Sequence, residues 1–321
     1  MNHNSPGDPI QSIAPFGEYS NLIMKYDPAS STLWSFMQPE GRPSFTSALL
    51  ADVADMQQCI RRWFASSPQP FQYFVFGSFV RGIYNLGGDL AYFVDRIRAR
   101  DAEGLRRYGY ACVNATHDNA VAYDAPVVTI ALVQGDALGG GFECALAFDV
   151  IVAERGAKFG LPEILFNLIP GMGAYSYLSR RLGITSAERM ITSGRIYTAA
   201  DMYEMGVVDL LCGDGEGETA VRDYIAKNAA RHNAQRAIFA ARRRVNPVPL
   251  KELHDIVDIW VEAALGLSEA DLRKMERLTA AQDRRRGNSI AESGGGEVKP
   301  TPGPLSRRGV TASLRLVPAP E

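Results

Sequence analysis

Residues 130–173 constrain this chain more than any other stretch of its sequence. The β-branched apolar run at 127–133, which leads into them, is typical of a buried strand. Three glycines follow at 139–141, immediately before a helical pattern at 142–148. The start of a helix carries free backbone N–H groups and a partial positive charge, so this turn could hold an anion or a developing oxyanion.

Two glutamates belong to the same stretch. Glu143 lies in the first turn of the predicted helix, where a carboxylate is favoured. Glu163 follows Pro162, which we expect at the first position of a helical turn. A lone triple glycine is more often a tight packing turn, and a lone glutamate at a helix start is usually solvated. It is their combination with a second glycine turn that favours a functional site.

That second turn lies earlier in the chain. A predicted strand at 71–76 leads into the loop GSFVRGIYNLGGDL, in which Gly87 and Gly88 precede Asp89 and an amphipathic helix. We expect Asp89 only to cap this helix and give it no catalytic part. Two glycine turns of this kind can face one cavity.

Strands and helices alternate along the rest of the chain. We expect further strands at 19–26, 31–37, 151–153, 158–159 and 207–211, and helices at 44–65, 105–122, 174–182, 186–192 and from Thr198. The pattern is helical throughout from Glu218 to about Arg286. We therefore divide the chain into a disordered N-terminus, an α/β core, a C-terminal helical region and a disordered tail, at 1–16, 17–215, 216–286 and 287–321.

The composition is that of an ordinary globular protein, with 321 residues, of which 46% are hydrophobic and 22% are charged. A formal net charge of −2 gives no reason to expect a nucleic-acid partner. No apolar run approaches membrane-spanning length, and the N-terminus lacks the pattern of a secretory signal. Cysteines and histidines are scattered, so we expect reduced cysteines, no metal site and a cytoplasmic location.

Several linked motifs point to a family. The segment IALVQGDALGGGFECALAFDVIVAE is followed by FGLPEILFNLIPGMGA and later by SGRIYTAADMYEMGVVDLL. Over residues 70–285 these motifs resemble the crotonase superfamily, the group of enoyl-CoA hydratases and isomerases. The resemblance implies an α/β fold, a crotonase-like spiral of ββα repeats with a C-terminal α-helical layer, assembled as a homotrimer.

The resemblance also implies roles for individual residues. The two backbone amides of the family's oxyanion hole fall on Gly88 and Gly140, and the two acid–base carboxylates fall on Glu143 and Glu163. Both acids are present, which favours chemistry that adds or removes water. The sequence does not indicate which glutamate takes the α-proton.

Positions that bind substrate in the family fall on Leu138, Gly139, Met172 and Trp260. Large apolar residues such as Met172 and Trp260 usually just pack in a core, so core packing remains an alternative for both. The arginines at 242–244 and 284–286 could meet an acidic carrier protein, but a solvated charge run is the simpler interpretation.

Three segments narrow the resemblance: NLGGDLAYF, GLPEILFNLIPGMGAYSYLSRR and IVDIWVEAALGLSEADLRKMERLTAAQDRRRG. They are similar to the bacterial diffusible signal factor synthases, which dehydrate 3-hydroxyacyl chains on acyl carrier protein and release cis-2-unsaturated fatty acids for cell–cell signalling. This resemblance implies no cofactor, because the substrate arrives as a thioester on acyl carrier protein or CoA. It also allows a regulatory sensor or receiver-domain protein as a partner.

Two other functions stay open at this point. The broader resemblance fits an enoyl-CoA hydratase or isomerase of fatty-acid metabolism, and some proteins of this fold are binding modules without activity. The intact Glu143 and Glu163 favour an enzyme. Acyl chain length and the cis or trans outcome cannot be read from the residues.

Overall fold

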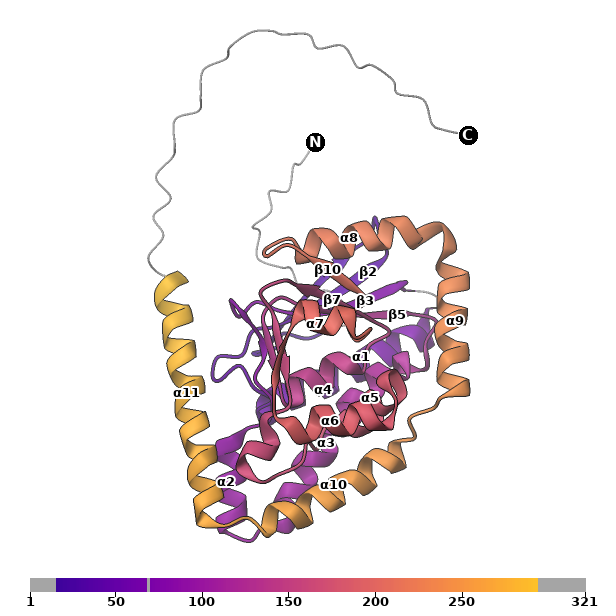
Figure 1. Cartoon of the computed structure of the whole chain (residues 1–321). Helices are drawn as coiled ribbons and strands as arrows, with labels where there is room; N and C mark the ends of the chain where they lie inside the picture. Colours follow the sequence, from indigo (N-terminus) through magenta and orange to yellow (C-terminus); the bar gives the residue numbers. More distant parts are fainter. Residues whose placement is uncertain (1–15, 68–69, 294–321) are drawn as a thin grey trace, which may run out of the picture.

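The computed structural model describes residues 16–67 and 70–293, which form two sheets with helices packed around them (Figure 1). The larger sheet has the strand order β1-β2-β3-β5-β7-β10. β1 and β2 pair antiparallel, and the others pair in parallel. Its strands are Leu22–Asp27 (β1), Thr32–Met37 (β2), Tyr73–Ser78 (β3), Val128–Val133 (β5), Val150–Glu154 (β7) and Leu210–Cys212 (β10).

The smaller sheet has the strand order β4-β6-β8-β9. Its strands are Ile83–Asn85 (β4), Asp136–Leu138 (β6), Lys158–Gly160 (β8) and Ile196–Thr198 (β9). Three successive chain segments each give one strand to the large sheet and the next to the small sheet: β3 and β4, β5 and β6, β7 and β8. Because these strands are neighbours within both sheets, the chain advances as a spiral, and the turns after β4 and β6 lie side by side.

Helices follow the strand pairs of the spiral. Their bounds are Ser47–Ser66 (α1), Leu90–Arg98 (α2), Ala102–Ala120 (α3), Gly140–Leu146 (α4), Ala174–Leu182 (α5), Ile184–Ser193 (α6) and Ala199–Glu204 (α7). Short 3₁₀ turns occur at Ala122–Asp124 (η1), Pro162–Phe166 (η2) and Ala229–Arg231 (η3). Helices α5 and α6 end at Gly183 and Gly194, and Thr198, where the sequence predicts a helix to begin, caps α7.

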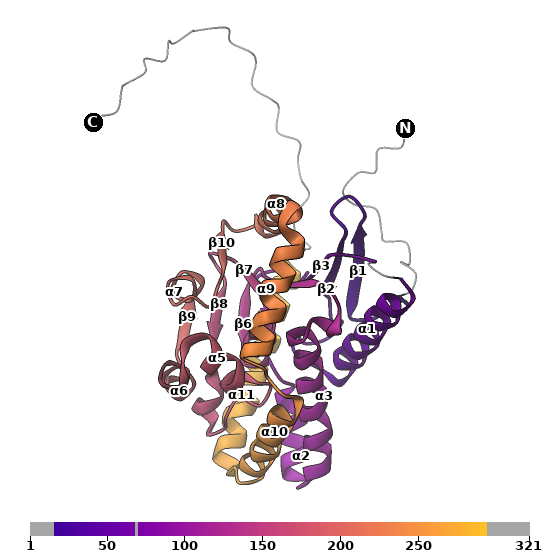
Figure 2. The ribbon, with the colours of Figure 1, turned by 90° about the vertical axis from the view of Figure 1, so that its right-hand side faces the viewer.

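The C-terminal helices form a frame around this core. They are Gly217–Asn228 (α8), His232–Val245 (α9), Leu250–Leu265 (α10) and Glu269–Ser293 (α11). In Figure 1, α8 crosses one end of the molecule, α9 descends along one side, α10 returns past α3, and α11 rises on the other side. Figure 2 shows α10 beside α2 and α3. Gly109 permits the close packing of α3 on α10, because a Cβ there would lie 2.5 Å from Cγ1 of Val257.

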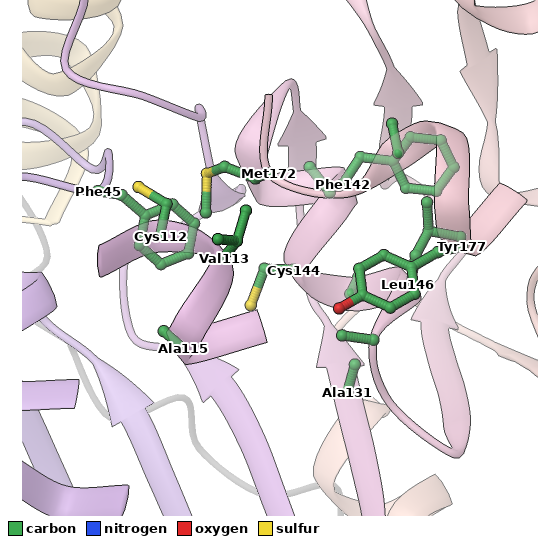
Figure 3. Packing of buried hydrophobic residues seen from close by; sticks show 14 of the residues in the cluster. Phe45, Cys112, Val113, Ala115, Ala131, Phe142, Cys144, Leu146, Met172 and Tyr177 are labelled. Atoms are coloured by element: carbon green, nitrogen blue, oxygen red, sulfur yellow. The ribbon is translucent and has the colours of Figure 1, made fainter. Parts of the chain in front are cut away.

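The large sheet is buried on both faces, which explains why its central strands are almost continuously apolar. Alternate residues of β3 belong to different hydrophobic clusters. Tyr73 and Val75 pack with Val221 and Ile225 of α8, whereas Phe74 packs in the main core, part of which is shown in Figure 3. The sequence pattern therefore places the large sheet between the α8 layer and the other helices.

The predicted α/β spiral with a C-terminal helical layer is confirmed. The sequence does not predict β4, β6 and β9, which have three residues each. The last strand of the core begins at Leu210, not at Val207.

Other boundaries also differ from the prediction. The helical region is four helices and not a continuous run; Pro247 and Pro249 separate α9 from α10, since proline lacks the N–H that a helix needs. Helix α11 continues to Ser293, past the expected end at Arg286. Phe16, which we assigned to a disordered N-terminus, is buried, and its ring centroid lies 5.8 Å from that of Trp63. The remaining predictions for 1–15 and 294–321 lie outside the described residues.

Candidate active site

All eight site residues expected from the sequence line one cavity of 330 Å³. They come from four parts of the chain: the turn after β4, the turn after β6 with the start of α4, the segment from η2 to α5, and helix α10. These residues are Gly88, Leu138, Gly139, Gly140, Glu143, Glu163, Met172 and Trp260. The spiral thus brings together residues that are far apart in the sequence.

The two glycine turns approach each other closely. A Cβ on Gly87 would lie 2.9 Å from the carbonyl oxygen of Leu138 and 3.0 Å from the amide nitrogen of Gly140. Both this close approach and the φ of 95° at Gly87 favour glycine at this position. Gly140 is the first residue of α4, so its N–H has no acceptor within the helix. The amides of Gly88 and Gly140 therefore lie at the wall of one cavity.

Glu143 is buried, with 1% of its surface exposed, in the first turn of α4. Its Oε1 accepts hydrogen bonds from the backbone N–H groups of Met172, at 2.7 Å, and Ala174, at 2.9 Å. Ala174 begins α5, and Gly173 before it has a φ of 112° that favours glycine. The start of α5 thus holds this carboxyl by N–H groups that the helix itself leaves free.

Glu163 lies in η2, directly after Pro162, which stands at the start of this turn as expected. Its Oε1 lies against Gly139: a Cβ on Gly139 would be only 2.6 Å from that oxygen. Its Oε2 is buried and, among the described residues, has no hydrogen-bond partner. One oxygen of the second carboxyl therefore has no donor, whereas Oε1 of the first carboxyl has two.

These surroundings raise the pKa of both glutamates, for partly different reasons. Burial raises the pKa of Glu143 to about 7, although its amide donors oppose the shift. Burial, with the charge of Glu143 adding to it, raises the pKa of Glu163 to about 8. Within the described residues, the cavity wall contains no Lys, Arg or His that would stabilise a second negative charge. At neutral pH the pair therefore favours a proton on Glu163 and the charge on Glu143.

The rest of the cavity wall is apolar. Trp260 of α10 packs edge-on against Phe93 of α2, with ring centroids 5.0 Å apart. Gly171 makes room for this indole, since a Cβ there would lie 2.8 Å from Trp260 Cγ. Most of the lining residues carry no pattern in the sequence that marks them as a cavity wall: Leu86, Leu90, Phe93, Tyr108, Cys112, Phe166, Leu168, Ile169, Leu278 and Ala281. Helical periodicity marks Leu90 and Phe93 as buried, but it cannot distinguish a core position from a cavity wall.

No group of three or more His, Cys, Asp or Glu side chains in the described part of the chain could hold a metal ion. Across the same residues, no helix combines the length and the apolar character needed to cross a membrane. Cys59, Cys112, Cys144 and Cys212 are all free thiols, as the sequence predicts. The cavity wall itself offers two carboxyls and the backbone of two glycine turns.

Comparison with known proteins defines the class. Residues 87–247, about half of the chain, match the family model described as enoyl-CoA hydratase/isomerase. The chain belongs to this family, within the crotonase superfamily.

Individual relatives add detail. The chain is 28% identical over 239 residues to the fatty acid oxidation complex subunit alpha of Pseudomonas aeruginosa, a match that covers 73% of this chain and 32% of the relative. The corresponding subunit of Pseudomonas syringae pv. tomato is 32% identical over 147 residues, which are 46% of this chain and 20% of that protein. The chain thus spans at most about a third of the length of these curated relatives.

Solved structures show the same fold. DspI of Pseudomonas aeruginosa matches with a TM-score of 0.61 and 25% identity, covering 74% of this chain and 93% of DspI. An enoyl-CoA hydratase/isomerase of Xanthobacter autotrophicus Py2 matches with a TM-score of 0.67 and 17% identity, covering 86% of this chain and 99% of the other. At 17% identity the second likeness concerns the fold alone.

Proposed function

We propose that this protein dehydrates a 3-hydroxyacyl thioester to a cis-2-enoyl thioester and then hydrolyses the thioester, as a diffusible signal factor synthase does. Acyl carrier protein is the proposed carrier, and the released unsaturated fatty acid is the proposed signal. The proposal rests on the sequence segments that resemble these synthases and on one structural observation. Glu143 and Glu163 line one apolar cavity beside two glycine turns, and only one of the two is held by amides.

The first step needs a strong polarisation of the substrate. The α-proton of a thioester is too weakly acidic for an ordinary carboxylate unless the enolate oxygen is stabilised. In the proposed mechanism the Gly88 and Gly140 amides donate to that oxygen, and a single such donor is worth about 10²–10³ in rate. One carboxylate takes the α-proton, the electrons of that bond form the new double bond, and the other carboxyl protonates the departing hydroxyl as water.

This chemistry requires two carboxyls in different protonation states. If both were ionised, neither could protonate the hydroxyl; if both were protonated, neither could take a proton. The amides on Glu143 and the missing donors at Glu163 supply this asymmetry at neutral pH. General acid–base catalysis by such a pair contributes about 10²–10⁴.

The second step reuses the same groups. Water attacks the thioester carbon, a carboxylate takes a proton from that water, and the two amides stabilise the tetrahedral oxyanion. Collapse of this intermediate breaks the C–S bond, and the carrier thiol leaves with a proton while the fatty acid is released. We assign the base of this step to Glu143, because its amide donors favour the charged form.

The test offers 3-hydroxyacyl chains of several lengths on acyl carrier protein and, in parallel, on CoA. Mass spectrometry then identifies free acids and residual thioesters, and comparison with cis and trans standards gives the geometry. We expect a 2-unsaturated free acid from the carrier-protein substrate. Rapid hydration of enoyl-CoA with no free acid released would contradict the proposal and favour the alternative, a general enoyl-CoA hydratase or isomerase.

A pure binding role is the third possibility that this assay separates, because it predicts no turnover of either substrate. The expected homotrimer, cytoplasmic location and regulatory partner stay predictions. Size-exclusion chromatography with light scattering would measure the first of these.

A further inference from the structure

The hydroxyl of Tyr108 in α3 lies beside the first glycine turn. It accepts a hydrogen bond from the backbone N–H of Asp89 at 3.0 Å and donates to the backbone carbonyl of Phe45. Tyr108 is buried, with 6% of its surface exposed, so its hydroxyl would be costly to leave without partners. One side chain thus joins two backbone segments that are more than forty residues apart in the sequence.

Phe45 completes the attachment on the other side of the turn. Its N–H donates to the carbonyl of Gly87 at 2.7 Å, within an isolated parallel bridge between Phe45 and Gly88. The residues before and after Gly88 are therefore each fixed by a hydrogen bond, through Phe45 on one side and Tyr108 on the other. The direction of the Gly88 N–H follows from these two bonds.

Packing restrains the same turn. A Cβ on Gly88 would lie 2.6 Å from Cζ of Phe93, so the ring covers the glycine directly. Phe93 in turn lies edge-on to the Tyr108 ring, with centroids 5.1 Å apart. The Tyr108 side chain consequently supports the turn both by its hydroxyl and by its ring.

Two helical turns further along α3, Thr116 contacts the other catalytic segment. Positions 108, 112 and 116 lie on one face of a helix. Cys112, on the same helix face, lines the cavity and belongs to the buried cluster that also contains Phe45 and Met172 (Figure 3). The Thr116 hydroxyl lies 3.2 Å from the carbonyl oxygen of Met172, whose N–H is one of the two donors to Glu143, and also 3.2 Å from the carbonyl oxygen of Val113 in its own helix.

We propose that α3 aligns the active site through two positioning residues, Tyr108 for the Gly88 amide and Thr116 for the turn that holds Glu143. Neither residue reacts with the substrate. The helix sets the distance between the group that polarises the carbonyl and the carboxyl that exchanges protons. This inference rests on the proposed oxyanion role of Gly88 and concerns what holds that amide in place.

The first experiment replaces Tyr108 by phenylalanine, which keeps the ring and removes the hydroxyl. The readout is the absorption band of a bound chromophoric enoyl-CoA analogue, which moves to longer wavelength as its carbonyl is polarised. We expect Tyr108→Phe to reduce this red shift and to lower kcat about 10- to 100-fold with little change in KM.

Tyr92→Phe is the matched control. Tyr92 stacks on Tyr108 with ring centroids 5.3 Å apart, and its hydroxyl also donates to a backbone carbonyl, that of Gly104, at 3.2 Å. It makes no hydrogen bond to the turn at 87–89 through its hydroxyl. Equal effects of the two substitutions on red shift and kcat would overturn the role of Tyr108.

The second experiment compares Thr116→Val, which removes the hydroxyl, with Thr116→Ser, which keeps it. Loosening the Met172 turn weakens the donors that favour the charged form of Glu143, so its pKa rises. We expect the limb of the pH–rate profile that reports Glu143 ionisation to move to higher pH in Thr116→Val, with the red shift unchanged. Thr116→Ser should restore the wild-type profile.

The outcomes distinguish this inference from the function on which it rests. A wild-type protein that binds the analogue without any red shift would contradict the proposed oxyanion role itself. A normal red shift in wild type that persists fully in Tyr108→Phe, or an unchanged pH profile in Thr116→Val, would contradict only the positioning role of the residue concerned.

Discussion

Glu143 and Glu163 line the same cavity, yet their oxygens have opposite surroundings. Oε1 of Glu143 accepts two backbone N–H groups at the start of α5, whereas the buried Oε2 of Glu163 has no partner among the described residues. The donors favour the charged form of Glu143, and the oxygen without a donor favours the protonated form of Glu163. The difference lies in the backbone around them and not in the residues themselves.

The largest expected effect comes from removing either ionisable group. Glutamine has nearly the shape of glutamate, and at 143 its carbonyl oxygen can still accept from Met172 and Ala174. We expect Glu143→Gln and Glu163→Gln each to lower the rate of dehydration by about 10²–10⁴, measured as enoyl product per unit time. Full activity in either variant would remove that residue from the mechanism.

A second substitution moves only one member of the pair. In Gly139→Ala the new methyl group would displace Glu163 Oε1, which lies 2.6 Å from its position, while the donors to Glu143 remain. We expect kcat to fall at least about tenfold. Because alanine rarely adopts the φ of 51° found at this residue, the substitution should also lower the free energy of unfolding by about 1–2 kcal/mol, measured by urea denaturation.

Gly206→Ala is the control for backbone strain. Gly206 has a φ of 77°, and nothing lies within 4 Å of a Cβ placed there. This variant should lose similar stability and keep its activity. A comparable loss of kcat in both variants would mean that Gly139→Ala acts through stability and not through Glu163.

The pH dependence of stability gives a smaller effect. Burial raises the pKa of Glu163 in the folded protein from 4.5 to about 8. Relative to Glu163→Gln, the wild type is therefore most stable below about pH 4.5 and loses that advantage as the pH rises towards 8. In thermal melts, the Tm of Glu163→Gln minus the Tm of wild type should be larger at pH 9 than at pH 5, by at least about 2 °C. A difference of the opposite sign would contradict the assigned protonation state.

A third carboxyl provides the smallest effect. The Glu252 carboxylate accepts hydrogen bonds from the Arg180 guanidinium, at 2.8 and 2.9 Å, and from the Ser176 hydroxyl. Partial burial raises the pKa of Glu252, but these hydrogen bonds outweigh it, so the pKa is lowered. Glu252→Gln should cost roughly 1 kcal/mol of stability above pH 5 and less as the pH falls through the lowered pKa. Because Glu252 does not line the cavity, kcat should stay unchanged.

Part of the site can be predicted from local patterns in the sequence, whereas Leu138, Met172 and Trp260 are expected only from the family resemblance. A buried strand, a glycine turn and a helix start mark Gly140 and Glu143, and Pro162 marks the turn of Glu163. The fold follows from the alternation of such units, although strands of three residues such as β4 and β6 leave no measurable period.

The asymmetry between the two glutamates has no local pattern. The donors to Glu143 come from residues 172 and 174, and only the closed spiral brings them to it. The same holds for Tyr108, whose hydrogen bonds join α3 to backbone groups of Phe45 and Asp89, which are far from it in the sequence. Such contacts depend on tertiary distances, which periodicity and capping rules do not contain.

The spiral has a further consequence. Gly88 follows β4 and Gly140 follows β6, and these strands are parallel neighbours, about 4.8 Å apart as in any sheet. The spacing of the two glycine turns is thus set by the spacing of the strands, and Glu143 is tied to one of these turns through α4, whereas Glu163 lies on the separate turn η2. A descendant of this chain could replace its acids and still keep both glycine turns at the wall of one cavity.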